Sequence, residues 1–178
     1  MFAWLSRWLD RRRTARELYG SIVTQARAPI FYSAWGVPDT LAGRCEMVML
    51  HLSAVLDRLS QEGSQGRALA RALSESFIAD MDANMRELTF GDLAVPREIK
   101  RAAAALFDRH SAYRRALEAR QTAPLLGAIE GQMAYLVPSG RLDAARLAHY
   151  MLEVAQCMSR QSGSALLAGR LGWPVPKP

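Results

Sequence analysis

An apolar stripe in residues 38–59, PDTLAGRCEMVMLHLSAVLDRL, decides the fold class of this chain. Apolar residues recur there every three or four positions, the spacing that places side chains on one face of an α-helix. The members of the stripe are Leu41, Cys45, Val48, Met49, Leu52, Val55, Leu56 and Leu59. Pro38 and Asp39 suit a helix entry, and Glu62, Gly63 and Ser64 are typical of a helix end. The stretch therefore predicts a long amphipathic helix.

The same periodicity appears on both sides of this stretch. Upstream, residues 14–27 predict a helix that opens with Thr14 and Glu17 in the spacing of a capping box. Downstream, four more helical stripes occupy residues 69–88, 95–117, 124–136 and 142–161. No segment alternates apolar and polar residues as a half-buried strand does. We expect an all-α, single-domain helical bundle of about six helices.

Length and composition fit one folded domain. The 178 residues suffice for a substantial core, and no apolar run approaches the ~20 residues that cross a bilayer. We predict a basic N-terminal segment at residues 1–13, a helical domain at residues 14–170 and a proline-rich tail over the surface at residues 171–178. Cys45 and Cys157 have no CxxC spacing and fall at apolar positions, so we expect buried free thiols.

Residues 77–101, FIADMDANMRELTFGDLAVPREIKR, form the densest acidic stretch. A calcium loop starting at Asp80 would need glycine at its sixth position and glutamate at its twelfth, where this chain has Met85 and Gly91. Asp80 and Asp82 diverge by about 200° on a helix, so they do not form an acid–base pair. Asp82 can pair with Arg86 four residues on. We predict neither a metal site nor a catalytic pair here.

The rest of the chain carries no enzyme motif. The three histidines, His51, His110 and His149, lie on or beside apolar stripes, where packing is their usual role. No metalloprotease, nucleophile-elbow, phosphate-loop or dinucleotide-binding pattern occurs. We therefore predict a protein that is not an enzyme and that uses no cofactor and no small-molecule substrate.

Three stretches resemble the ubiquinol–cytochrome c chaperone family: residues 18–27, residues 31–59 and residues 77–101. The likeness covers roughly residues 16–120. In the acidic stretch it is carried by Phe77, Asp80, Met81, Asp82, Asn84, Arg86, Glu87, Gly91, Asp92, Leu93 and Val95, whereas Thr89 and Pro96 depart from it.

The resemblance implies an assembly factor of the cytochrome bc1 complex that binds newly made cytochrome b and shields its transmembrane helices. It points to a partner-facing helix with the residues Phe77, Asp80, Met81, Asp82, Asn84, Arg86, Glu87 and Asp92. Methionine suits an adaptable apolar groove. We expect most of Met47, Met49, Met81, Met85, Met133, Met151 and Met158 in the core and a minority in such a groove.

The N-terminal segment is MFAWLSRWLDRRR, and residues 1–16, which include it, carry a net charge of +4 in a chain whose net charge is +6. Trp4 and Trp8 share a helical face, and Arg11, Arg12 and Arg13 follow. Contact with an anionic membrane surface is one interpretation, and packing onto the bundle is another. A helical adaptor that binds ribosome or RNA through these arginines is the alternative function. We expect a cytoplasmic protein, peripheral on the inner membrane face if this segment binds lipid.

Overall fold

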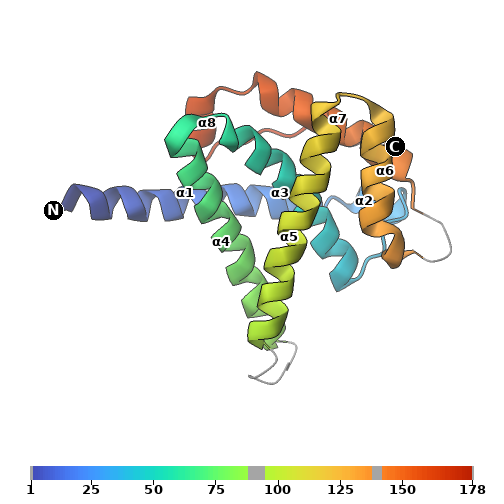
Figure 1. Ribbon diagram of the computed structural model, residues 1–178, viewed down its shortest axis with the longest axis horizontal. Coiled ribbons are helices and arrows are strands. Elements are labelled where there is room, and N and C mark those ends of the chain that lie inside the picture. The colour runs from blue at the N-terminus through green and yellow to red at the C-terminus, as the bar shows by residue number, and fades with distance from the viewer. Residues whose placement is uncertain (1, 88–94, 138–141, 178) are drawn as a thin grey trace.

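The computed structural model describes residues 2–87, 95–137 and 142–177. Within them the long helices are α1 (Phe2–Ala26), α3 (Leu41–Ser60), α4 (Gly63–Glu87), α5 (Val95–Glu118), α6 (Thr122–Met133) and α7 (Ala144–Arg160). The short elements are α2 (Pro29–Ser33), η1 (Ala134–Leu136) and α8 (Gly163–Leu167). These described residues contain no strand, so the prediction of an all-α bundle of about six helices is confirmed (Figure 1).

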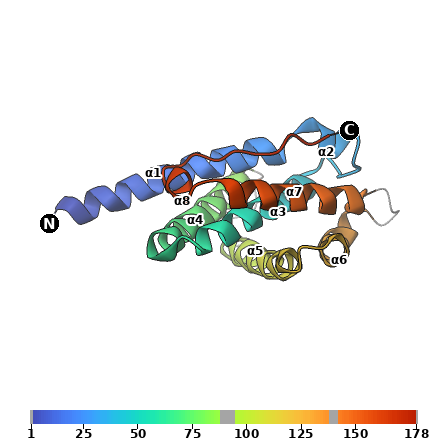
Figure 2. The same ribbon diagram turned by 90° about the horizontal axis from the view of Figure 1, so that it is seen from above.

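Helix α3 is the centre of the bundle. All residues from 46 to 56 are buried, because α1, α4, α5 and α7 pack around this helix (Figure 2). The sequence predicts one buried face, whereas the structure buries α3 on every side, as is typical of a helix at the middle of a domain. In the predicted stripe Cys45 is half-buried, and Leu41 is the exposed member. It is 54% exposed, because it opens the helix at the edge of the bundle.

The two ends of α3 are set by short-range contacts. Thr40 caps the helix, since its hydroxyl oxygen accepts a hydrogen bond from the Gly43 amide at 3.1 Å. Gly43 also permits close packing, because a Cβ there would lie 2.0 Å from the Pro38 carbonyl oxygen. At the other end Gly63 has φ 63°, a left-handed conformation that favours glycine. The predicted turn between α3 and α4 is therefore confirmed.

Helix α1 passes through the predicted boundary at residue 14 without a break. Thr14 lies inside this helix and caps nothing, so the capping-box prediction is wrong. Residues 2–13 contain no glycine or proline that would stop a helix, and their arginines are good helix formers. From Ala15 onward α1 packs against the core, while residues 6–13 are exposed.

The chain ends in an extended tail over the surface. Residues 170–177 run along α1 in the same direction as that helix (Figure 2). Trp173 fastens the tail, because its indole Nε1 donates a hydrogen bond to the Ser21 hydroxyl oxygen at 3.0 Å. The indole also meets the His51 ring edge-on, with ring centroids 5.4 Å apart. These contacts hold the described part of the tail on the surface of α1.

Candidate functional site

Residues 77–87 of the acidic stretch form the C-terminal half of α4, and the two apolar members of the predicted partner-binding set in this helix, Phe77 and Met81, lie inside the bundle. Phe77 is fully buried and Met81 is 8% exposed. Both side chains hold α4 against the core, so in this structure neither presents a surface to a partner. Asp92 lies outside the described residues, as does the side chain of Glu87.

Asp80 connects α4 to α1. The Tyr19 hydroxyl donates a hydrogen bond to the Asp80 carboxylate at 2.8 Å. Burial, and then this hydrogen bond, raise the pKa of Tyr19 well above its ordinary value. The Asn84 amide donates to the Asp80 main-chain carbonyl at 2.7 Å, not to the carboxylate. Asp80 is thus a structural residue that fixes where α4 lies.

Asp82 and Arg86 lie on the outside of α4. Arg86 Nε donates to the Asp82 carboxylate at 2.8 Å, which confirms the pairing predicted from their spacing. Their side chains are 38% and 58% exposed, so the pair is solvated. Among the predicted partner-binding residues whose side chains the structure describes, Arg86 is therefore exposed, and Asp80, Asp82 and Asn84 are half-buried.

The end of α4 and the start of α5 project together from the bundle (Figure 1). We call residues 82–86 and 96–105 the α4–α5 tip. No residue in these two ranges is fully buried. Met85 on α4 and Ile99 and Ala102 on α5 are half-buried, and we call these three incompletely covered apolar residues the seam.

The outer side of the tip is basic. A shallow hollow of about 540 Å³ is lined by Pro96, Arg97, Lys100, Arg101 and Ala104. Glu98 pairs with Arg101 at 2.7 Å, and Phe107, one turn beyond the hollow, is 72% exposed. This side of α5 therefore combines positive charge with exposed apolar area.

A buried polar cluster, missed in the sequence, holds the bundle together beneath the tip. Glu46 on α3 is fully buried and accepts hydrogen bonds to both carboxylate oxygens from Arg109 Nε on α5, each at 2.9 Å. These bonds raise the pKa of Arg109 above its ordinary value. The Tyr135 hydroxyl donates to the same carboxylate at 2.8 Å. A glutamate inside the apolar run EMVML was the available signal that α3 needs a cationic partner.

The methionines are core residues rather than the lining of a groove. Met47, Met49, Met81, Met133, Met151 and Met158 are buried. Met85, at the α4–α5 tip, is half-buried. The expectation that most of them lie in the core is confirmed, and only Met85 of the seven lies near the surface.

The histidines show no catalytic arrangement in the described residues. His51 is fully buried, with Nδ1 2.7 Å from the Met47 carbonyl oxygen and Nε2 3.1 Å from the Tyr150 hydroxyl. The Met47 carbonyl can only accept, so Nδ1 carries the proton, and in the neutral ring Nε2 accepts from the Tyr150 hydroxyl, which itself accepts from Gln25. Burial lowers the pKa of His51 to about 4. His110 is half-buried and His149 is exposed.

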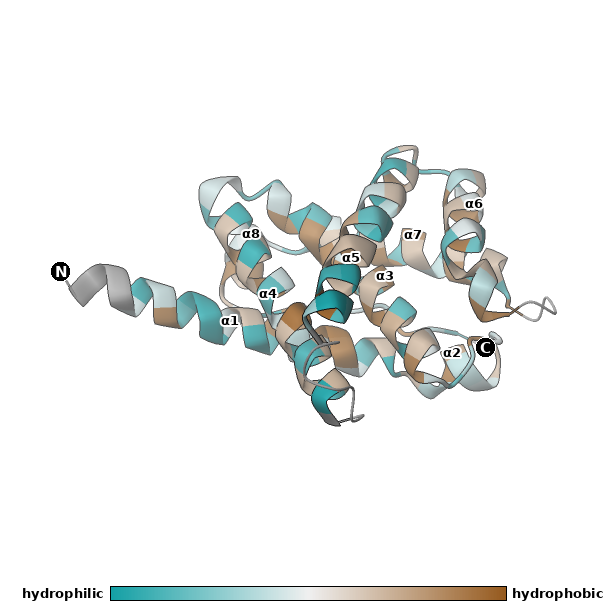
Figure 3. Ribbon diagram, turned by 60° about the horizontal axis from the view of Figure 1, so that its bottom comes forward, coloured by the Kyte–Doolittle hydropathy of each residue, from teal (hydrophilic) through white to brown (hydrophobic). Residues whose placement is uncertain are grey.

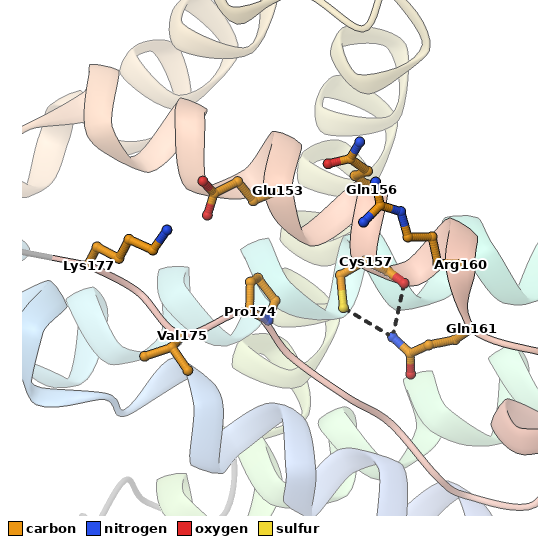
Figure 4. Close-up of a pocket in the computed structure, with 8 residues that line it drawn as sticks. All are labelled: Glu153, Gln156, Cys157, Arg160, Gln161, Pro174, Val175 and Lys177. Carbon is orange, nitrogen blue, oxygen red and sulfur yellow. Dashed lines mark hydrogen bonds between the residues drawn. The ribbon is translucent and has the colours of Figure 1, made fainter.

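The cysteines are half-buried, a correction to the expectation of full burial. Burial raises the pKa of Cys45 to about 11, so its thiol stays protonated at neutral pH. Cys157 lies in a cleft of about 490 Å³ between α7 and the tail, where Gln161 donates to its carbonyl oxygen at 3.3 Å (Figure 4). The described part of the chain holds no group of three or more histidine, cysteine or acidic residues that could bind a metal.

The predicted membrane-contact residues lie on the projecting part of α1. Trp8 is 38% exposed, and the guanidinium of Arg12 stacks over its ring at 4.6 Å. Arg11 and Arg13 are exposed, and Arg13 pairs with Asp10 at 3.3 Å. Of Trp4, the structure describes only that its backbone is helical. None of the described helices is long and apolar enough to span a bilayer.

Comparison with known proteins gives two matches. The family described as ubiquinol-cytochrome C chaperone matches residues 33–173. The matched range starts later and ends later than residues 16–120, over which the sequence resembled this family. The crystal structure of the Cbp3 homolog from Brucella abortus is similar, with 32% sequence identity and a TM-score of 0.83 over 98% of this chain and 97% of that chain. No curated protein matches the sequence.

Proposed function

Because the chain belongs to the ubiquinol-cytochrome C chaperone family, we propose that it binds newly made cytochrome b during assembly of the cytochrome bc1 complex. The role is one of binding and shielding, without a chemical step. Its neutral buried histidine and its protonated Cys45 thiol agree with such a role, since neither is activated for catalysis.

The α4–α5 tip is where we place the contact with the client. A chaperone for transmembrane helices needs apolar surface that it can expose and cover at small cost in free energy. The half-buried seam of Met85, Ile99 and Ala102 provides this, because few fully buried contacts hold the two helix ends together. Phe77 and Asp80 act indirectly, by holding the lower part of α4 in place.

The polar residues of the tip would form the rim of this contact. Asp82 and Arg86 are solvated and paired with each other, so an incoming segment can exchange water for contacts at little cost. We infer that the chain works at the cytoplasmic face of the inner membrane, because the transmembrane helices of cytochrome b have to be met there before they pack.

Deletion of the gene tests the function. We expect loss of the assembled bc1 complex and of cytochrome b haem, measured by native electrophoresis and by difference spectra. Restoration of both by the reintroduced gene is the control. Normal levels of complex and haem in the deletion strain would overturn the proposal.

Photocrosslinking tests the contact. A photoreactive residue placed at position 85 or 99 should crosslink to cytochrome b during its synthesis. The same residue at position 156, an exposed site on α7, is the matched control and should not. Crosslinks at position 156 alone would move the client away from the tip.

A further inference from the structure

The first part of α1 projects from the bundle. We call residues 2–13 the N-terminal arm, which extends beyond the rest of the domain (Figures 1 and 2). Every residue from 6 to 13 is exposed, so the alternative in which this segment packs onto the bundle does not hold for them. Trp8 and Leu9 are 38% and 53% exposed side by side. Exposed apolar groups of this size on a projecting helix are typical of a binding surface.

The apolar residues of the arm share one face of the helix, and arginines border that face. At about 100° of rotation per residue, positions 4, 5, 8 and 9 fall within an arc of roughly 140°. Arg7 and Arg11 flank one edge of this arc, and Arg13 flanks the other. Arg12 falls within the arc, but its guanidinium lies on the Trp8 ring rather than apart from it. Asp10 lies on the opposite side, where it pairs with Arg13.

We propose that the N-terminal arm binds in the interface of an anionic membrane, with Trp8 and Leu9 among the headgroups and the arginines on lipid phosphates. Tryptophan and arginine are the side chains that favour this boundary, and guanidinium groups bind phosphate through two parallel hydrogen bonds. This goes beyond the proposed function and does not rest on it, since lipid binding needs no cytochrome b.

The charge of the arm and its exposed apolar residues favour an anionic membrane over a second copy of the chain or a nucleic acid as its partner. Residues 1–16 hold five arginines against one aspartate, so the arms of two copies of this chain would repel each other. A nucleic acid would satisfy the arginines but leave Trp8 and Leu9 in water. An anionic bilayer satisfies both, because phosphate and apolar depth lie next to each other there. Figure 3 shows the described part of the arm as mostly hydrophilic, as a helix that rests on a membrane without crossing it has to be.

Continuity with the bundle strengthens this interaction. A free peptide of twelve residues would lose much of its binding energy to the cost of helix nucleation. In this chain the arm continues α1, whose residues from Ala15 to Ala26 are fixed against the core. The helix is therefore formed before it reaches lipid.

Vesicle co-sedimentation of the purified full chain tests the proposal. We expect pelleting with phosphatidylcholine vesicles that contain phosphatidylglycerol, little pelleting with phosphatidylcholine alone, and a decrease as salt is raised. The triple change Arg11→Gln, Arg12→Gln and Arg13→Gln should weaken binding by roughly 100-fold. The double change Trp8→Ser and Leu9→Ser should weaken it by roughly tenfold or more.

Matched variants on α5 keep the test specific. Arg97→Gln, Lys100→Gln and Arg101→Gln remove the same charge from another exposed helical surface, and Phe107→Ser removes another exposed apolar side chain. Neither should change pelleting by more than about twofold, and circular dichroism should show all four proteins folded. Equal loss in the α5 variants would show a general effect of charge and overturn the proposal. The proposal would also be overturned if the variant with Trp8→Ser and Leu9→Ser pelleted with anionic vesicles like the unchanged protein. Binding of RNA as tight as binding of anionic vesicles, and lost with the same three arginines of the arm, would overturn it too.

Discussion

The core around α3 and the α4–α5 tip are built from the same kinds of residue but are closed to different degrees. In the core, residues 46–56 are all buried, and the Glu46 carboxylate that pairs with Arg109 is out of water. At the tip the apolar residues are half-buried, and the ion pair of Asp82 with Arg86 is solvated. The comparison indicates that the core carries the stability of the bundle, which leaves the tip free to change its contacts.

Removal of the arginine from each ion pair should give the largest difference in stability between the core and the tip. Arg109→Ala leaves the Glu46 carboxylate buried with only the Tyr135 hydroxyl as a partner, so we expect a loss of about 3–5 kcal/mol in the free energy of unfolding. Arg86→Ala, the matched change at the tip, should cost about 0–1 kcal/mol. Urea denaturation of both variants measures this. Similar losses would mean that the tip is as closed as the core.

A pair of apolar truncations separates stability from function. Leu52→Ala removes a fully buried side chain from α3 and should cost about 2–5 kcal/mol. Ile99→Ala, at the half-buried seam, should cost about 1 kcal/mol and yet reduce the level of assembled bc1 complex. Denaturation curves and native electrophoresis give the two readouts. An Ile99 variant with normal bc1 levels would remove the seam from the client contact.

His51 makes the core sensitive to acid. Its pKa falls from about 6.5 in the unfolded chain to about 4 in the fold, so only the neutral ring fits its buried site. The stabilisation is complete above pH 6.5 and is lost as the pH falls towards 4, by about 3 kcal/mol. Melting temperatures over this range should therefore drop, and less steeply in His51→Gln.

Helical periodicity predicted most of the fold because each long helix buries an apolar face. Periodicity could not show which residues of the other helices each face contacts. The Asp82–Arg86 pair was predictable, since its residues lie four apart on one helix. The Glu46–Arg109 pair joins residues 63 apart, and only the packing of α5 on α3 brings them together.

Local signals also failed where a helix continues past them. Thr14 and Glu17 have the spacing of a helix start, but the same residues are tolerated inside a helix, and nothing in residues 2–13 ends α1. Leu41 fits the apolar period yet lies at the first turn of α3, where the bundle no longer covers it. Periodicity predicts which face of a helix a side chain occupies, but it does not predict how far the neighbouring helices cover that side chain.

The smallest expected effect comes from the contact that joins the core to the tip. Tyr19→Phe removes the hydroxyl that donates to Asp80 and leaves the packing of the ring unchanged. The free energy of unfolding should fall by about 1 kcal/mol, because the partly buried Asp80 carboxylate loses the hydrogen bond from this hydroxyl. If Asp80 positions α4 for the client, crosslinking from position 85 should fall by more than this loss of stability explains. Ser21→Ala, which removes the acceptor for Trp173 from the same helix, is the control and should leave that crosslinking unchanged. A Tyr19→Phe protein that crosslinks normally would limit Asp80 to holding the fold.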